Sequence, residues 1–253
     1  MAQEDFFKEI EHREIPWGER VIWVPIFYRD VLSFGAFFLA SSERLKALLP
    51  SSRMHPYRIT PWHGVLSVAA YEFKDCDFGP YNEVSISIPF TLDKATPMFT
   101  GLVRKGPQEP KLYIHHLPVT TEIALAAGVE FAGYPKFLAS IEFEQEADWV
   151  TCRLAEGERH ILTLAGRKLD VEDAPRSRAH VFTARNGRLL RSETILSERG
   201  LAVSRDSSYV RLELGDHPIA RELEELDIGR MLAYQYAPEY QTILTPVIES
   251  VAL

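Results

Sequence analysis

Short runs of β-favouring residues, each bounded by turn residues, most constrain how this sequence can fold. Runs of this length and composition, separated by Gly, Pro, Asn or Asp, are typical of strands. The clearest are Val65–Phe73, Glu83–Phe90, Lys111–His116, Ser140–Glu144, Trp149–Leu154 and His160–Ala165, with a further one at Tyr209–Leu214. The sequence therefore predicts a mainly β (α+β) fold in which helices are few and peripheral.

Two dipeptides predict tight hairpins. Glu156-Gly157 separates two of these runs, and Asn186-Gly187 lies between two apolar pairs. Asn-Gly is the strongest local indication of a hairpin, because both residues accept a positive φ.

Helices are predicted from capping residues. Ser42, Thr120 or Thr121, and Asp216 are candidate N-caps, and Pro50 and Gly128 are candidate stops. Pro218 is tolerated in a first helical turn. The predicted spans are Gln3–Arg13, Ser42–Leu49, Glu122–Ala127 and Asp216 to about Leu226. The segment after Asp227 is compatible with helix or strand. No repeat or linker divides the chain, so we predict one domain over residues 1–253.

Composition excludes several classes of protein. The 28 basic and 36 acidic residues, with no Lys- or Arg-rich stretch, argue against nucleic-acid binding. The apolar run Val21–Ala40 contains Pro25, Arg29 and Asp30, so it predicts buried strands and no membrane span. No signal peptide is readable, and two separated cysteines predict free thiols in a reducing cytoplasm. Neither a cofactor motif nor a metal-type ligand spacing is present.

Gly133-Tyr134-Pro135-Lys136 places a single lysine on a rigid turn between apolar stretches. Pro135 fixes its own φ and pushes Tyr134 into an extended conformation, so Lys136 leaves the turn in a defined direction. One interpretation is a lysine whose amine reaches the surface past an apolar flank. The other is a buried lysine, which loses its proton more easily and can attack a ketone to form a Schiff base.

Two glutamates are candidate partners of this lysine. In the run around Glu83, Val84 and its alternate neighbours share one strand face, and Glu83 with two serines shares the other. That polar face either meets solvent or lines an interior where a carboxylate could move protons. Glu72 interrupts another apolar run, which predicts either a site residue or an edge position.

Two adjacent histidines, His115 and His116, end a predicted strand before Leu117-Pro118. Adjacent strand residues point to opposite faces, so only one of them can face a given cavity. No third ligand at a convincing spacing accompanies them, which argues against a metal pair and favours structural roles.

Taken together, these motifs resemble the acetoacetate decarboxylase family over nearly the whole chain. The similarity is carried by Tyr71-Glu72-Phe73, Gly79-Pro80-Tyr81-Asn82-Glu83, Tyr113 to Gly128, Glu130, the lysine turn, Arg211–Leu214 with Asp216-His217, and Ser41 to Pro50. The resemblance implies a large antiparallel curved sheet or β-barrel-like core. It also implies a large homo-oligomer.

The resemblance implies a chemistry as well. The family's lysine forms a Schiff base with a β-keto acid. Acetoacetate decarboxylase is itself a known example of an enzyme whose lysine is activated as a nucleophile. Lys136 matches that lysine, and Glu83 and Glu72 match the two acidic residues of its site. We further predict that the substrate is contacted by Arg29, Tyr134, Phe137, His116 and Leu117.

The sequence departs from the family pattern at three charged positions. Phe137 stands where the family has a second lysine, Val129 stands where it has an arginine, and another arginine position falls near Val31. Arg29, two residues earlier on the same predicted strand face, is the candidate substitute. A lost charge-assisted contact is worth roughly 1.5–3 kcal/mol, which favours a substrate larger or less charged than acetoacetate.

Three functions fit these observations. The first is a decarboxylase-like lyase that acts on a β-keto acid through Lys136. The second is an imine-dependent aldolase or dehydratase that uses the same residues on a keto acid. The third is a barrel that binds a small ketone or keto acid without catalysis.

Overall fold

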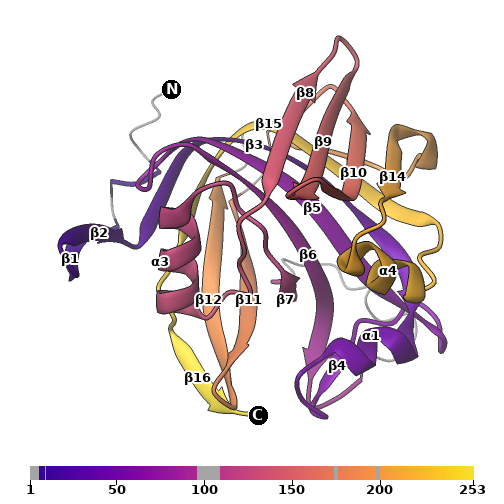
Figure 1. Cartoon of the computed structure of the whole chain (residues 1–253), viewed down its shortest axis with the longest axis horizontal. Coiled ribbons are helices and arrows are strands. Elements are labelled where there is room, and N and C mark those ends of the chain that lie inside the picture. Colours follow the sequence, from indigo (N-terminus) through magenta and orange to yellow (C-terminus); the bar gives the residue numbers. More distant parts are fainter. Residues whose placement is uncertain (1–5, 9, 96–108, 174–175, 198–199) are drawn as a thin grey trace.

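The computed structural model describes residues 6–8, 10–95, 109–173, 176–197 and 200–253, and strands predominate in them (Figure 1). The strands are β1 (Arg13–Trp17), β2 (Arg20–Val24), β3 (Ile26–Ser41), β4 (Met54–Pro56), β5 (His63–Cys76), β6 (Tyr81–Leu92), β7 (Lys111–His116), β8 (Ser140–Gln145), β9 (Trp149–Glu156), β10 (Arg159–Arg167), β11 (Ser177–Arg185), β12 (Arg188–Ser197), β13 (Ala202–Ser204), β14 (Val210–Leu214), β15 (Met231–Leu244) and β16 (Glu249–Ala252). The helices are α1 (Ser42–Leu48), α3 (Glu122–Ala132) and α4 (Pro218–Glu225), with a 3₁₀ turn η1 (Ser207–Tyr209).

The larger sheet closes on itself. Its strands follow the order β13-β15-β3-β5-β6-β7-β11-β12-β16, and β12 also pairs with β15, so the strands from β15 round to β12 form a ring. Among the described pairings, β7 and β11 are parallel and the others are antiparallel. The expected antiparallel sheet is therefore a mixed one, because α3 and the strands β8, β9 and β10 intervene between β7 and β11 in the chain.

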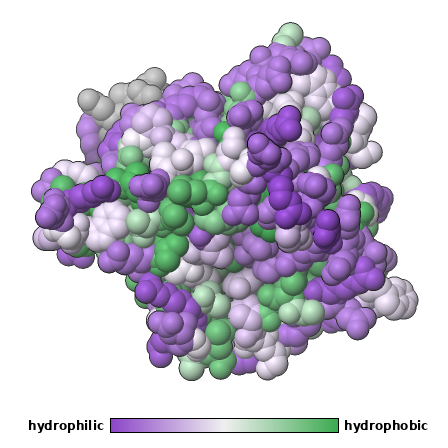
Figure 2. Space-filling model, in the orientation of Figure 1, coloured by the Kyte–Doolittle hydropathy of each residue, from purple (hydrophilic) through white to green (hydrophobic). Residues whose placement is uncertain are grey.

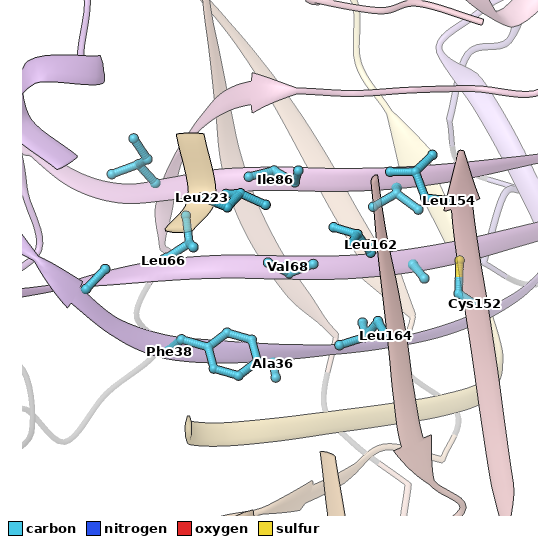
Figure 3. Close-up of a cluster of buried hydrophobic side chains, with 14 of the residues drawn as sticks. Ala36, Phe38, Leu66, Val68, Ile86, Cys152, Leu154, Leu162, Leu164 and Leu223 are labelled. Atoms are coloured by element: carbon cyan, nitrogen blue, oxygen red, sulfur yellow. The ribbon is translucent and has the colours of Figure 1, made fainter. Parts of the chain in front are cut away.

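A second sheet, in the order β14-β10-β9-β8, covers the outside of this ring. Figure 3 shows the apolar layer between the two sheets, with side chains from β3, β5 and β6 meeting those from β9, β10 and α4. Alternate residues of β5 and β6 enter this layer, among them Val68 and Ile86, and both are fully buried. The intervening residues of these strands point into the ring.

The local sequence patterns predicted the strands correctly. Each predicted run lies within an observed strand, apart from Tyr209, which closes η1. Both hairpins are confirmed, and Asn186 and Gly187 have φ values of 51° and 70°. The Val21–Ala40 run forms most of β2 and β3. The undecided C-terminal segment forms β15 and β16.

The helix ends differ from the predicted ones. Helix α3 continues through Gly128 and ends at Ala132, where Gly133 adopts the left-handed conformation with φ 63°. A glycine inside a helix costs only about 1 kcal/mol, so Gly128 does not stop it, whereas Gly133 supplies the C-cap. Ser41 caps α1 in place of Ser42, and His217 caps α4 in place of Asp216.

The predicted N-terminal helix at residues 3–13 is wrong for the described residues, because residues 6–8 form a turn, residues 10–12 are not helical and Arg13 begins β1. Residues 3–5 and 9 lie outside the described part of the chain. No described helix is long and apolar enough to span a bilayer. Figure 2 shows a mostly hydrophilic face with an apolar area over α3, where Val129 and Phe131 are exposed.

Candidate active site

The interior of the ring contains a cavity of about 430 Å³, a size typical of small-molecule sites. Glu83, Ser85 and Ser87 of β6 line this cavity, whereas Val84 and Ile86 lie in the apolar layer outside it. The polar face of this strand therefore faces the interior rather than bulk solvent. Small residues of neighbouring strands leave the space open, since Gly35 and Ala69 also line it.

Lys136 enters the cavity from the turn that follows α3. The turn is held by hydrogen bonds from Tyr134 N–H to the Gly128 carbonyl (3.1 Å) and from Lys136 N–H to the Tyr134 carbonyl (2.8 Å). The lysine side chain is only 6% exposed, and its Nζ donates to Glu83 Oε2 at 2.8 Å. The side chain therefore does not reach the surface.

Helix α3 shapes the space around this lysine. A Cβ built on Gly128 would lie 2.6 Å from Lys136 Cδ and Cε. Because carbon atoms pack at about 3.5–4.0 Å, only glycine admits the lysine chain in this position. Gly128 is thus explained by its contact with Lys136, and no pattern among its neighbours in the sequence predicts that contact.

Three buried tyrosines and the partly buried Tyr71 surround the lysine–glutamate pair. The ring centroids of Tyr81 and Tyr134 lie 5.5 and 5.7 Å from Lys136 Nζ, and the Tyr28 and Tyr81 hydroxyls are 3.2 Å apart. Burial and the nearby Glu83 carboxylate raise the pKa of all four phenols, including Tyr71. They are neutral hydrogen-bonding groups at physiological pH.

Glu72 lies on the other face of β5 from the cavity. Tyr71 and Phe73 line the cavity, whereas Glu72 alternates with them and follows Ala70, which lies in the apolar layer. One of its carboxylate oxygens is buried without a hydrogen-bond partner among the described residues. The structure does not bring Glu72 together with Lys136 inside the cavity.

Arg29 is also absent from the cavity wall. Its guanidinium pairs with the buried Asp77 carboxylate at 2.6 Å and with Asp75 at 3.7 Å. The expectation that Arg29 shares a strand face with Val31 fails, because the pairing of β3 with β5 shifts register between Tyr28 and Val31. A register irregularity changes which side chains face inward.

The remaining predicted contacts divide between the cavity and the core. Tyr134 and Leu117 are buried and line the cavity. Phe137 packs against the apolar layer between the sheets, so it does not touch the cavity. His116 also lies outside the wall and bonds to Glu222 of α4.

Arg178 is a wall residue that the sequence did not single out. It is the second residue of β11, its side chain is about half exposed, and its Nη1 lies 3.4 Å from Glu193 Oε2. Among the lining residues described, Lys136 and Arg178 carry the positive charges. No local pattern marks Arg178, because only the closure of the sheet brings its strand to the cavity.

The structure thus defines a class of protein with a closed mixed sheet, an outer sheet and a buried lysine–glutamate pair in the enclosed cavity. The family model for acetoacetate decarboxylase (ADC) matches residues 14–250. The chain therefore belongs to the acetoacetate decarboxylase family.

Solved structures share this fold. An acetoacetate decarboxylase from Legionella pneumophila is 17% identical with a TM-score of 0.69, covering 90% of this chain and 87% of its own. An acetoacetate decarboxylase-like enzyme from Sphingomonas wittichii RW1 is 16% identical with a TM-score of 0.54, covering 89% and 93%.

The enduracididine biosynthesis enzyme MppR, solved with pyruvate bound, is 10% identical with a TM-score of 0.61, covering 95% of this chain and 98% of its own. At these identities the likeness concerns the fold. A search of curated proteins gives no match.

Proposed function

We propose that this protein is a carbon–carbon lyase that decarboxylates a β-keto acid through a Schiff base on Lys136. The observation that carries the proposal is the buried Lys136 Nζ, 2.8 Å from Glu83 and inside a cavity large enough for a substrate. Membership of the acetoacetate decarboxylase family supports the same chemistry. The site is proposed to bind small keto acids and ketones, of which a β-keto acid is the substrate that loses carbon dioxide.

The reaction begins when the Lys136 ammonium gives a proton to the Glu83 carboxylate, which lies within hydrogen-bonding distance. The neutral amine attacks the keto carbon, and Glu83 returns the proton to the departing hydroxyl, so that loss of water leaves a protonated imine. As the bond to the carboxylate carbon breaks, its electron pair moves toward the imine nitrogen and carbon dioxide leaves. A proton from water, relayed by Glu83, adds to the enamine carbon, and hydrolysis of the resulting imine releases the ketone and regenerates the Lys136 ammonium.

The shape of the cavity supports a substrate larger than acetoacetate. Glu83 and Ser87 both line the cavity and are four residues apart on β6, a separation of about 13 Å at roughly 3.3 Å per residue. The carbon chain of acetoacetate has three C–C bonds, as many bonds as one residue of backbone, and so spans about 3.6 Å. The wall beyond the lysine therefore accommodates a long substituent on the ketone.

The second candidate is an imine-dependent aldolase or dehydratase. The same fold occurs in MppR, which was solved with the condensation product of pyruvate and imidazole 4-carboxaldehyde. A cavity that extends well beyond Lys136 offers space for a second reactant next to the imine. Release of carbon dioxide supports the first candidate, whereas carbon–carbon bond formation or loss of water supports the second.

Trapping with borohydride tests both enzyme candidates. The protein is incubated with acetoacetate, acetylacetone or pyruvate, reduced with borohydride and digested. The mass of the peptide that contains Lys136 is then measured by mass spectrometry. The reduced ketone should add to this peptide in wild type and in Lys168→Ala, a control that removes a lysine outside the cavity wall. Lys136→Ala should show no adduct, and Glu83→Gln should form it more slowly.

Two results would count against these candidates. Absence of any adduct across several ketones would overturn both. Ligand binding that survives Lys136→Ala unchanged would then favour a barrel that binds without catalysis.

We also propose that the protein forms a homo-oligomer in a reducing compartment such as the cytoplasm. Family membership supports the first point, and the two free, buried cysteines support the second. Light scattering coupled to size-exclusion chromatography tests the oligomer.

A further inference from the structure

His115 and His116 converge on one carboxylate outside the cavity. The Nε2 atoms of both histidines lie 2.8 Å from the same oxygen, Oε1 of Glu222 on α4. Among the described residues, these three side chains form a group whose potential ligand atoms all lie within 4.8 Å of one another. The two ring centroids are 4.3 Å apart.

Local structure explains how two neighbouring residues reach the same point. Adjacent side chains in a regular strand point to opposite faces. Here the histidines close β7, and its pairing with β6 shifts register beside them, between Ile86 and Ser87. Beyond His116 the chain leaves the strand for Leu117-Pro118, so the second ring is free to turn toward the first.

We propose that His115, His116 and Glu222 bind a divalent transition metal of the zinc type. Two imidazoles and one carboxylate are donors that suit Zn²⁺, and three protein ligands leave a fourth position for water. A tetrahedral ion with bonds of about 2.1 Å separates its ligand atoms by about 3.4 Å. The present 2.8 Å contacts reach that spacing by side-chain movements of about half an ångström.

The three side chains are open to solvent, and their hydrogen bonds can be exchanged for bonds to a metal ion. The side chains of His115, His116 and Glu222 are 15%, 21% and 33% exposed, so water and a metal ion reach them from solvent. Without an ion, both imidazoles donate an Nε2 proton to one carboxylate oxygen. On metal binding each ring carries its proton on Nδ1 instead, which frees Nε2 to coordinate, and the cation takes the place of the two N–H donors beside the carboxylate.

The position of the site predicts a stabilising role. Leu117, directly after His116, donates its N–H to the Pro135 carbonyl at 3.3 Å, and Val119 donates to the Phe137 carbonyl at 2.9 Å. The segment that holds the lysine turn is thus the segment that the metal would tie to α4. The ion itself lies outside the cavity wall, so it anchors the segment without touching the reacting atoms.

Calorimetric titration of the tag-free, chelator-treated protein with Zn²⁺ tests the proposal, and Co²⁺ absorption reports the geometry. Wild type should bind one equivalent and gain several degrees in melting temperature, with no response to Mg²⁺. His116→Ala and Glu222→Gln should each weaken binding at least about 100-fold. His63→Ala is the matched control, because His63 bonds to Thr60 away from the cluster, and it should bind as wild type does.

Two results would overturn the proposal. One is the absence of a stoichiometric Zn²⁺ equivalent in wild type. The other is unchanged affinity in both variants of the cluster. Glu222→Gln keeps the size of the side chain, so it remains informative if His116→Ala folds poorly, and circular dichroism monitors folding in each case.

Discussion

Replacing Gly128 by alanine should separate catalysis from stability. The added Cβ would lie 2.6 Å from Lys136 Cδ and Cε, so these methylenes must move by about 1 Å to restore a normal carbon contact. The Nζ–Oε2 distance to Glu83 is 2.8 Å, and a displacement of about 1 Å breaks that hydrogen bond. A misplacement of this size costs on the order of 100-fold in rate.

Stability should respond far less than the rate does. Alanine is favoured over glycine inside a helix by roughly 0.5–1 kcal/mol, and Gly128 lies within α3. The lost hydrogen bond between the buried charged groups costs roughly 1.5–3 kcal/mol, which outweighs that gain. We expect the free energy of unfolding to fall by about 0.5–2.5 kcal/mol, measured by urea denaturation.

The rate of borohydride trapping at Lys136 is the functional readout. Gly229→Ala is the matched control, because its added Cβ would make an ordinary 3.5 Å contact with Leu39 Cβ. The control should trap at the wild-type rate. A Gly128→Ala protein that traps ketones at the full rate, or that loses activity only because it unfolds, would refute this account of the lysine's position.

Three further outcomes test the packing. Gly166→Ala should destabilise the protein by about 1–3 kcal/mol in urea, because its Cβ would lie 2.7 Å from ring carbons of the fully buried Tyr234; wild-type stability would contradict this packing. Leu162→Ala, in the layer between the sheets, should cost about 2–5 kcal/mol, and a loss below 1 kcal/mol would contradict its burial. Burial raises the pKa of the Cys76 thiol from 9.0 to about 11 and that of Cys152 further. At pH 8, alkylation of Cys76 should therefore be at least about 100-fold slower in the native protein than in urea, and its rate should increase with pH. Rapid labelling of the native protein at pH 8 would contradict this burial.

Local patterns in the sequence determined the strands, both hairpins and the lysine turn. Each of these depends on neighbours a few residues away, such as the positive φ of Asn186 and Gly187 or the fixed φ of Pro135. The alternation around Glu83 also revealed which residues share its face. It did not reveal whether that face meets solvent or a cavity.

Closure of the sheet decided the composition of the site. It turned Glu83 toward Lys136, left Glu72 on the opposite face of β5, and brought Arg178 to the cavity wall. A register shift removed Arg29 from that wall, and α4 placed Glu222 beside two histidines more than a hundred residues earlier in the chain. These relations depend on which strands pair and in what register, and pairing between distant segments leaves no trace in the order of neighbouring residues.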